Sequence, residues 1–84
     1  MKNKILIKIY FLQLDDTFEL YIPINKNIAN IIELICKAIS EMKNIEKIDY
    51  NNLALYNHDT SIIYSPDIII KNSNIKNGTR LILM

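Results

Sequence analysis

The first quarter of the chain carries apolar residues at every second position, a pattern that predicts β-strands. Over Lys4 to Leu12 the odd positions are Ile or Phe, and β-branched and aromatic residues dominate. Asp15 and Asp16 follow, and their side chains favour turns. Alternation then resumes from Phe18 to Ile24. Two strands joined by a polar turn predict a β-hairpin at the start of the fold.

The apolar spacing changes after Pro23, a residue without a backbone donor that suits a strand end. Asn25 or Asn27 then offers a cap for a helix that begins near Ile28. Apolar residues recur at helical spacing and form one predicted stripe. This stripe consists of Ile28, Ile31, Ile32, Ile35, Ile39 and Met42. We therefore expect an amphipathic helix with one buried face.

The pattern after the helix predicts a short irregular segment and then two short strands. Leu53 to Tyr56 has the pattern of a third strand with its leucines facing inward. Asn57 to Thr60 is polar and predicts a turn. Ser61 to Tyr64 is then expected to form a short fourth strand, which Ser65-Pro66 ends.

The last part of the chain predicts one further strand. Ile68 to Ile70 is apolar but too short to establish a period, so a strand and a tether both remain open. Asn77-Gly78 is a turn signal. Arg80 to Met84 follows as the closing strand, with Leu81 and Leu83 on one face.

This order of elements predicts an α+β fold in which one helix packs on one face of a mixed sheet of four to five strands. If the last strand lies parallel beside the first, the helix supplies the long crossover that parallel pairing needs. With 84 residues, half of them apolar, we expect one core and a single domain over residues 1–84.

Three segments resemble ubiquitin-like proteins, which have the β-grasp fold. These are Phe18-x-Leu20-x-Ile22, Ile28-x-x-Ile31-x-x-x-Ile35 and the closing segment Asn74 to Leu83. Within that segment, Ile75 resembles the buried aliphatic residue that pins the loop before the final strand. The chain is most similar to the small bacterial YukD/EsaB proteins associated with type VII secretion. The likeness rests on length, on the passage Leu20-Tyr21-Ile22-Pro23 and on the Asn-Gly turn before the last strand.

The resemblance implies a non-catalytic protein-binding module with an accessory or regulatory role in a bacterial type VII (ESX/WxG) secretion system. Its implied partners are cytosolic domains of the secretion machinery. The alternative is a ubiquitin-like adaptor or scaffold domain unrelated to secretion. Gly78 is the only glycine, so we expect no Gly-Gly tail for conjugation or sulfur carriage. A ferredoxin-type cluster needs four cysteines and Cys36 stands alone, so no cofactor is expected.

Charge and composition restrict the class of partner and the cellular compartment that we expect. Ten Lys and Arg against nine Asp and Glu give a net charge of +1, which argues against a nucleic-acid partner. A lone cysteine suits a reducing compartment, so we expect the cytoplasm. The apolar run from Ile5 to Leu14 contains Lys8 and Gln13 and resembles neither a signal peptide nor a membrane span, so direct membrane insertion is not expected. Composition leaves the oligomeric state open.

Residues with catalytic or ligand-binding chemistry are few, and each has a structural interpretation. His58 lies in a predicted turn beside Asp59, without a second histidine or a cysteine nearby in sequence. The pair Asp15 and Asp16 suits turn geometry better than a cation site. Cys36 flanks the helix stripe and suits packing. Asn77-Gly78-Thr79 matches a glycosylation sequon, but a tight turn needs the same residues. We therefore assign no catalytic residue and no metal site.

One candidate site remains, on the sheet face that the helix does not cover. If the odd residues of the first strand face the helix, the even ones face away, and the last strand follows the same rule. The predicted partner-binding residues are Leu6, Lys8, Tyr10, Arg80, Ile82 and Met84. Ala54 and Tyr56 would extend them. A mixed apolar and cationic patch is typical of a protein interface, but scattered apolar surface residues are also normal, and both interpretations remain open.

Overall fold

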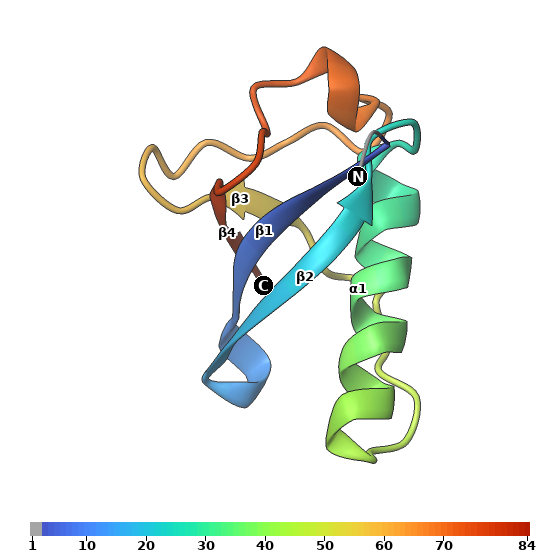
Figure 1. Cartoon of the computed structure of the whole chain (residues 1–84). Coiled ribbons are helices and arrows are strands. Elements are labelled where there is room, and N and C mark those ends of the chain that lie inside the picture. Colours follow the sequence, from blue (N-terminus) through green and yellow to red (C-terminus); the bar gives the residue numbers. More distant parts are fainter. Residues whose placement is uncertain (1–2) are drawn as a thin grey trace.

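The computed structural model of the protein describes residues 3–84, and these form one helix packed on a four-stranded sheet (Figure 1). The elements are β1 (Lys4–Phe11), η1 (Leu12–Leu14), β2 (Asp16–Pro23), α1 (Ile28–Lys43), β3 (Leu55–Asn57), η2 (Ile70–Asn72) and β4 (Arg80–Leu83), where η denotes a 3-10 helix. The strand order across the sheet is β2-β1-β4-β3. The predicted α+β fold is confirmed, with four strands.

The sheet is mixed because β1 pairs with both of its neighbours in different directions. It runs antiparallel to β2, as expected for a hairpin, and parallel to β4. β3 then pairs antiparallel with β4. β1 and β4 are the central pair, and the long connection between them contains α1. The predicted parallel contact of the first and last strands is confirmed.

The core lies between α1 and the inner face of the sheet. Ile9, Phe11, Leu81 and Leu83 are completely buried, as the alternation predicts. From the helix, the buried residues are Ile28, Ile31, Ile32, Ile35, Cys36 and Ile39. The predicted buried residue before the last strand, Ile75, is 5% exposed. A single cluster of buried apolar side chains therefore holds both layers together.

Local hydrogen bonds explain where the helix and the hairpin begin and end. The Asn27 side chain accepts a hydrogen bond from the backbone N–H of Asn30 at 2.9 Å, so Asn27 is the N-cap and Asn25 is not. Asn44, with φ of 52°, ends the helix in the left-handed region. Asp15 adopts the same region (φ 49°) at the end of η1 and turns the chain into β2.

The predicted burial of Met42 is wrong, because its side chain is 54% exposed. Its angle on the helix matches the stripe, but it belongs to the last turn of α1, which extends past the β1–β2 connection (Figure 1). Lys43 covers the sheet at this end instead. Its Nζ lies 5.6 Å from the centre of the Phe18 ring and 2.7 Å from a carboxylate oxygen of Asp16.

The predicted strand over Ser61 to Tyr64 does not form. Only an isolated bridge joins Ile63 to Tyr56. The Asn57 side chain accepts hydrogen bonds from the backbone N–H groups of Asp59 and Thr60 and so holds the preceding turn. Ser61 then takes a left-handed conformation (φ 62°), so the extended pairing with β3 is limited to residues 62–64 and is too short for a strand. The third strand also begins later than expected, at Leu55 rather than Leu53.

The apolar segment Ile68 to Ile70, whose state the sequence left open, joins the start of the helix to η2. Ile69 forms an isolated bridge with Asn27, and Ile70 is completely buried. The N–H groups of Ile70 and Lys71 donate to the carbonyls of Lys26 and Ile24. Among residues 3–84, no helix is long and apolar enough to cross a membrane.

Candidate functional site: the open face of the sheet

The residues predicted to bind a partner share the sheet face opposite α1. In the parallel β1–β4 ladder, Lys8 lies opposite Arg80 and Tyr10 lies opposite Ile82. Their chain neighbours on both strands are buried on the inner face, so these side chains point outward. We call this surface the open face. It comprises Leu6, Lys8, Tyr10, Glu19, Tyr21, Ala54, Tyr56, Arg80, Ile82 and Met84.

The register orders the open face into rows that cross the strands. One row is charged and consists of Glu19, Lys8 and Arg80 on β2, β1 and β4. On one side of it, Tyr21 lies opposite Leu6. The charges are therefore placed between groups of apolar side chains.

The apolar row on the other side of the charges is longer. Tyr10, Ile82 and Tyr56 lie opposite one another on β1, β4 and β3. Beyond them, Met84 and Ala54 exchange two backbone hydrogen bonds and continue the β3–β4 pairing. This row contains two aromatic side chains, which are enriched at protein interfaces.

The cations of the open face are paired with acids that the sequence analysis did not include. Lys8 Nζ lies 3.8 Å from an Oε1 of Glu19, and the Arg80 guanidinium donates a hydrogen bond to the Asp59 carboxylate. Both pairs are about half exposed. The alternation that sends Leu20 and Ile22 inward also sends Glu19 and Tyr21 outward, so the β2 residues were accessible to sequence reasoning.

Tyr10 is fixed in place by the turn that follows β1. Its hydroxyl donates a hydrogen bond to Asp15 Oδ1 at 2.5 Å. This hydrogen bond to a carboxylate raises the pKa of Tyr10, because the bond favours the protonated phenol. The Tyr10 hydroxyl is consequently linked to the turn that leads into β2.

The open face is partly apolar. Tyr21 is 56% and Met84 is 43% exposed, whereas Leu6, Tyr10, Tyr56 and Ile82 are half-buried. A hollow on this face is lined in part by Lys8, Tyr10, His58 and Arg80. A sheet face with partly exposed apolar side chains suits contact with another macromolecule.

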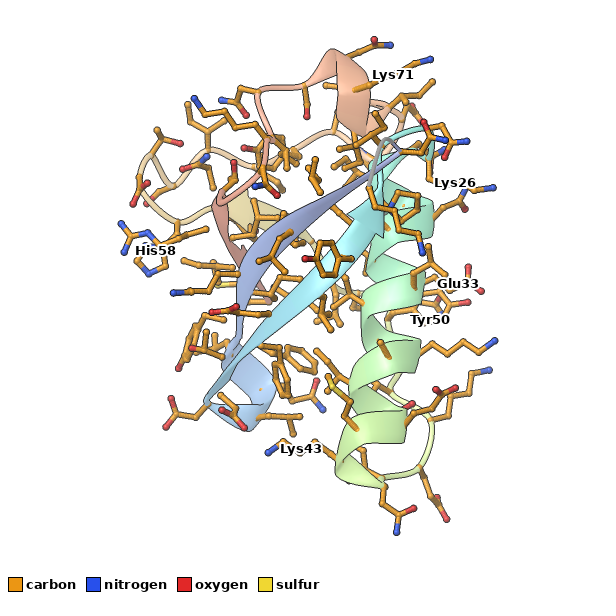
Figure 2. The ribbon with its side chains drawn as sticks, in the orientation of Figure 1. Lys26, Glu33, Lys43, Tyr50, His58 and Lys71 are labelled. Atoms are coloured by element: carbon orange, nitrogen blue, oxygen red, sulfur yellow. The ribbon has the colours of Figure 1, made fainter. Side chains whose placement is uncertain are left out.

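The contacts of the other candidate residues, His58, Asp15 and Asp16, are those of surface and turn residues. His58 lies at the periphery of the molecule (Figure 2), where its Nδ1 is 3.7 Å from an Asp59 oxygen already bonded to Arg80. Asp15 and Asp16 act separately, the first on Tyr10 and the second on Lys43. In residues 3–84, no group of three or more His, Cys, Asp or Glu side chains is placed to hold a metal ion.

Cys36 is part of the core, and the Asn-Gly turn makes backbone contacts that stabilise the sheet. Cys36 is 2% exposed, and burial raises the pKa of its thiol to about 11. Asn77 Oδ1 accepts the backbone N–H of Leu6 at 2.7 Å, and the N–H of Gly78 donates to the Leu6 carbonyl at 2.7 Å. Gly78 has φ of 90°, which side chains rarely tolerate. This turn therefore joins the start of β4 to β1.

No protein-family model matches the chain, and no curated protein matches it. Solved structures do resemble it. The N-terminal ubiquitin-like domain in the 4931431F19Rik protein is 20% identical with a TM-score of 0.71, over 98% of this chain and 74% of that one. The fold is the ubiquitin-like β-grasp.

Two further similar structures are an EccD5 domain and a chain of an ESX-5 inner membrane complex. The ubiquitin-like domain of EccD5 from Mycobacterium xenopi is 14% identical with a TM-score of 0.74, over 96% of this chain and 92% of that one. A chain of a MycP5-free ESX-5 inner membrane complex is 9% identical with the same TM-score, and the match covers 98% of this chain but 21% of the larger one. At these identities the likeness shows the fold alone.

Proposed function

We propose that residues 1–84 act as a single ubiquitin-like domain that binds a protein partner through the open face and performs no catalysis. The observation that carries this proposal is the order of that face, in which a charged row lies between groups of partly exposed apolar side chains. Aromatic and aliphatic groups supply contact area, and oriented charges select the partner. Lys8 and Arg80 have the central positions.

The proposed setting is the cytoplasm of a bacterium with a type VII (ESX/WxG) secretion system, where the domain is an accessory or regulatory component. The support is the resemblance to YukD/EsaB proteins together with the two structural neighbours from ESX proteins. The proposed partners are cytosolic domains of the secretion machinery. The competing function is a ubiquitin-like adaptor unrelated to secretion, and a similar domain occurs in the 4931431F19Rik protein.

The experiment is complementation of a deletion strain. Leu6→Asp with Ile82→Asp places two carboxylates on the open face, and circular dichroism with thermal unfolding establishes that the variant is folded. Lys37→Glu with Glu41→Lys is the matched control, because it exchanges charges on exposed positions of α1 and leaves the sheet unchanged. Export of small WxG substrates is the measurement.

We expect export with the control variant and none with the folded open-face variant. Normal export with Leu6→Asp and Ile82→Asp would exclude the open face as the binding site. Unchanged export in the deletion strain itself would exclude the role in secretion and favour the adaptor.

A further inference from the structure

The two edges of the sheet differ in whether another segment covers them. Outside β3, the N–H of Asn57 donates to Ile62 and that of Tyr64 donates to Leu55, so residues 62–64 occupy this edge. Outside β2, none of residues 3–84 is paired with the strand (Figure 1). β2 has eight residues, and a long free edge is a template for another strand.

The alternation of hydrogen-bonded pairs along the hairpin shows which backbone groups of β2 face this free edge. The N–H of Ile24 donates to the Asn3 carbonyl at 3.0 Å, so Ile24 faces β1. In an antiparallel ladder, successive residues alternate between facing the partner strand and facing away from it. The outward backbone positions of β2 are therefore Thr17, Glu19, Tyr21 and Pro23.

The residues at both ends of this outward row offer no free backbone N–H to an added strand. The N–H of Thr17 already donates to the Asp16 side chain at 2.8 Å, and Pro23 has no N–H. Glu19 and Tyr21 between them each present a donor and an acceptor. The free edge therefore offers both a backbone donor and a backbone acceptor at only two residues, Glu19 and Tyr21, with Leu20 between them.

An apolar groove lies beside this edge, between β2 and α1. Its lining includes Leu20, Ile22, Leu34, Ile35 and Ala38. Leu34 is 42% exposed on the helix, although it is a large apolar residue. A strand added to β2 would bring its inward side chains next to this groove.

We infer that a second copy of the chain occupies the edge, with β2 antiparallel to β2 and Leu20 opposite Leu20. In this register each Glu19 lies opposite a Tyr21, and all four of these residues pair. Moving one step in one direction places Glu19 opposite Glu19, and like charges directly opposite are destabilising. Moving one step in the other direction places Glu19 opposite Pro23, which lacks a donor. The self-complementary register is consequently the best one available.

The resulting dimer has one continuous sheet of eight strands. Its two-fold axis is perpendicular to the sheet, so both helices lie on one side and both open faces lie on the other. Leu20 and Leu34 of one copy approach the same groove of the other copy and cover apolar surface. This inference does not depend on the proposed function, since it rests on the backbone groups along the edge of β2, although the side chains of Glu19 and Tyr21 also belong to the open face.

The test is a cysteine scan of the register in the full chain carrying Cys36→Ala. Light scattering at increasing concentration gives the oligomeric state. Leu20→Cys is expected to form a disulfide-linked dimer readily, because opposed residues of an antiparallel pair have the separation that a disulfide needs. Glu19→Cys and Tyr21→Cys lie opposite themselves only in the two shifted registers. Preferential crosslinking of either one would overturn the inference.

A second pair of variants separates backbone pairing from side-chain contact. Tyr21→Pro removes the outward N–H without affecting the β1 ladder, and Tyr21→Ala keeps this donor. We expect Tyr21→Pro to weaken dimerisation roughly tenfold or more, since two hydrogen bonds are lost per dimer, and Tyr21→Ala to weaken it less. A chain that remains monomeric at millimolar concentration would show that the edge takes a different strand or none.

Discussion

Lys8 and Arg80 lie directly opposite each other on the two central, parallel strands, and each cation is paired with an acid on its other side. Like charges in opposed positions of a sheet repel. Glu19 and Asp59 offset this repulsion, because an acid stands on the outer side of each of the two adjacent cations. The pairing therefore serves the stability of the sheet as well as any partner.

The charge row predicts that removing the acids destabilises the sheet. Glu19→Gln with Asp59→Asn is expected to lower the free energy of unfolding by a few tenths to about 1 kcal/mol, because exposed ion pairs contribute little. The effect should shrink in 1 M salt, where charges are screened. Adding Arg80→Gln should restore part of the loss, and urea unfolding measures all three variants. A loss that is insensitive to salt would contradict this electrostatic explanation.

Two neighbouring turns of the helix predict opposite sensitivities to truncation. Ile39 is completely buried, whereas Met42 is 54% exposed. Ile39→Ala should cost roughly 2–5 kcal/mol, because it leaves a cavity between the helix and the sheet. Met42→Ala should change stability by less than about 0.5 kcal/mol. Chemical denaturation of both variants tests this, and a large cost at Met42 would restore the stripe that the sequence predicted.

The start of the helix predicts a difference between two asparagines. Asn27→Ala removes the oxygen that accepts from Asn30 and should cost about 1 kcal/mol. Asn27→Asp keeps an acceptor beside the helix N-terminus and should retain most of the stability. Asn25→Ala is the control and is expected to be neutral. Thermal unfolding of the three variants measures this, and equal losses at both positions would refute the cap.

Burial of Cys36 predicts slow reaction of its thiol. The folded pKa of about 11 exceeds the ordinary value of 9.0, so at pH 9 roughly one thiol in a hundred is ionised. Because the raised pKa belongs to the folded state, this thiol favours folding below pH 9, and its contribution is lost as the pH rises toward 11. Alkylation by iodoacetamide at pH 9 measures the reactivity.

The matched control for this labelling is Met42→Cys in a chain with Cys36→Ala, which places a thiol at an exposed position of the same helix. This thiol should react at the rate of a free cysteine, and urea should bring Cys36 to a similar rate. Equally fast labelling of folded Cys36 would show that the core opens on the timescale of the reaction.

The hairpin, the helix and the closing strand were predictable because each leaves a local trace in the chain. Alternation over β1 and β2 and the helical spacing from Ile28 to Ile39 state which side chains are buried. These same patterns placed the six predicted residues on one face. Ser61 to Tyr64 failed because its pattern is compatible with a strand while its backbone turns at Ser61, a preference that a short apolar pattern does not reveal.

By itself the sequence determined most of the inward-facing residues, Met42 excepted, and that one helix covers one sheet, since periodicity depends only on the residues of a single element. Only the tertiary structure decided the register between distant strands and what lies along each edge of the sheet. It set Arg80 opposite Lys8 and Asp59 beside Arg80, covered the edge of β3 and left the edge of β2 free. Pairing between distant segments follows from how the whole core packs, and no local pattern carries it.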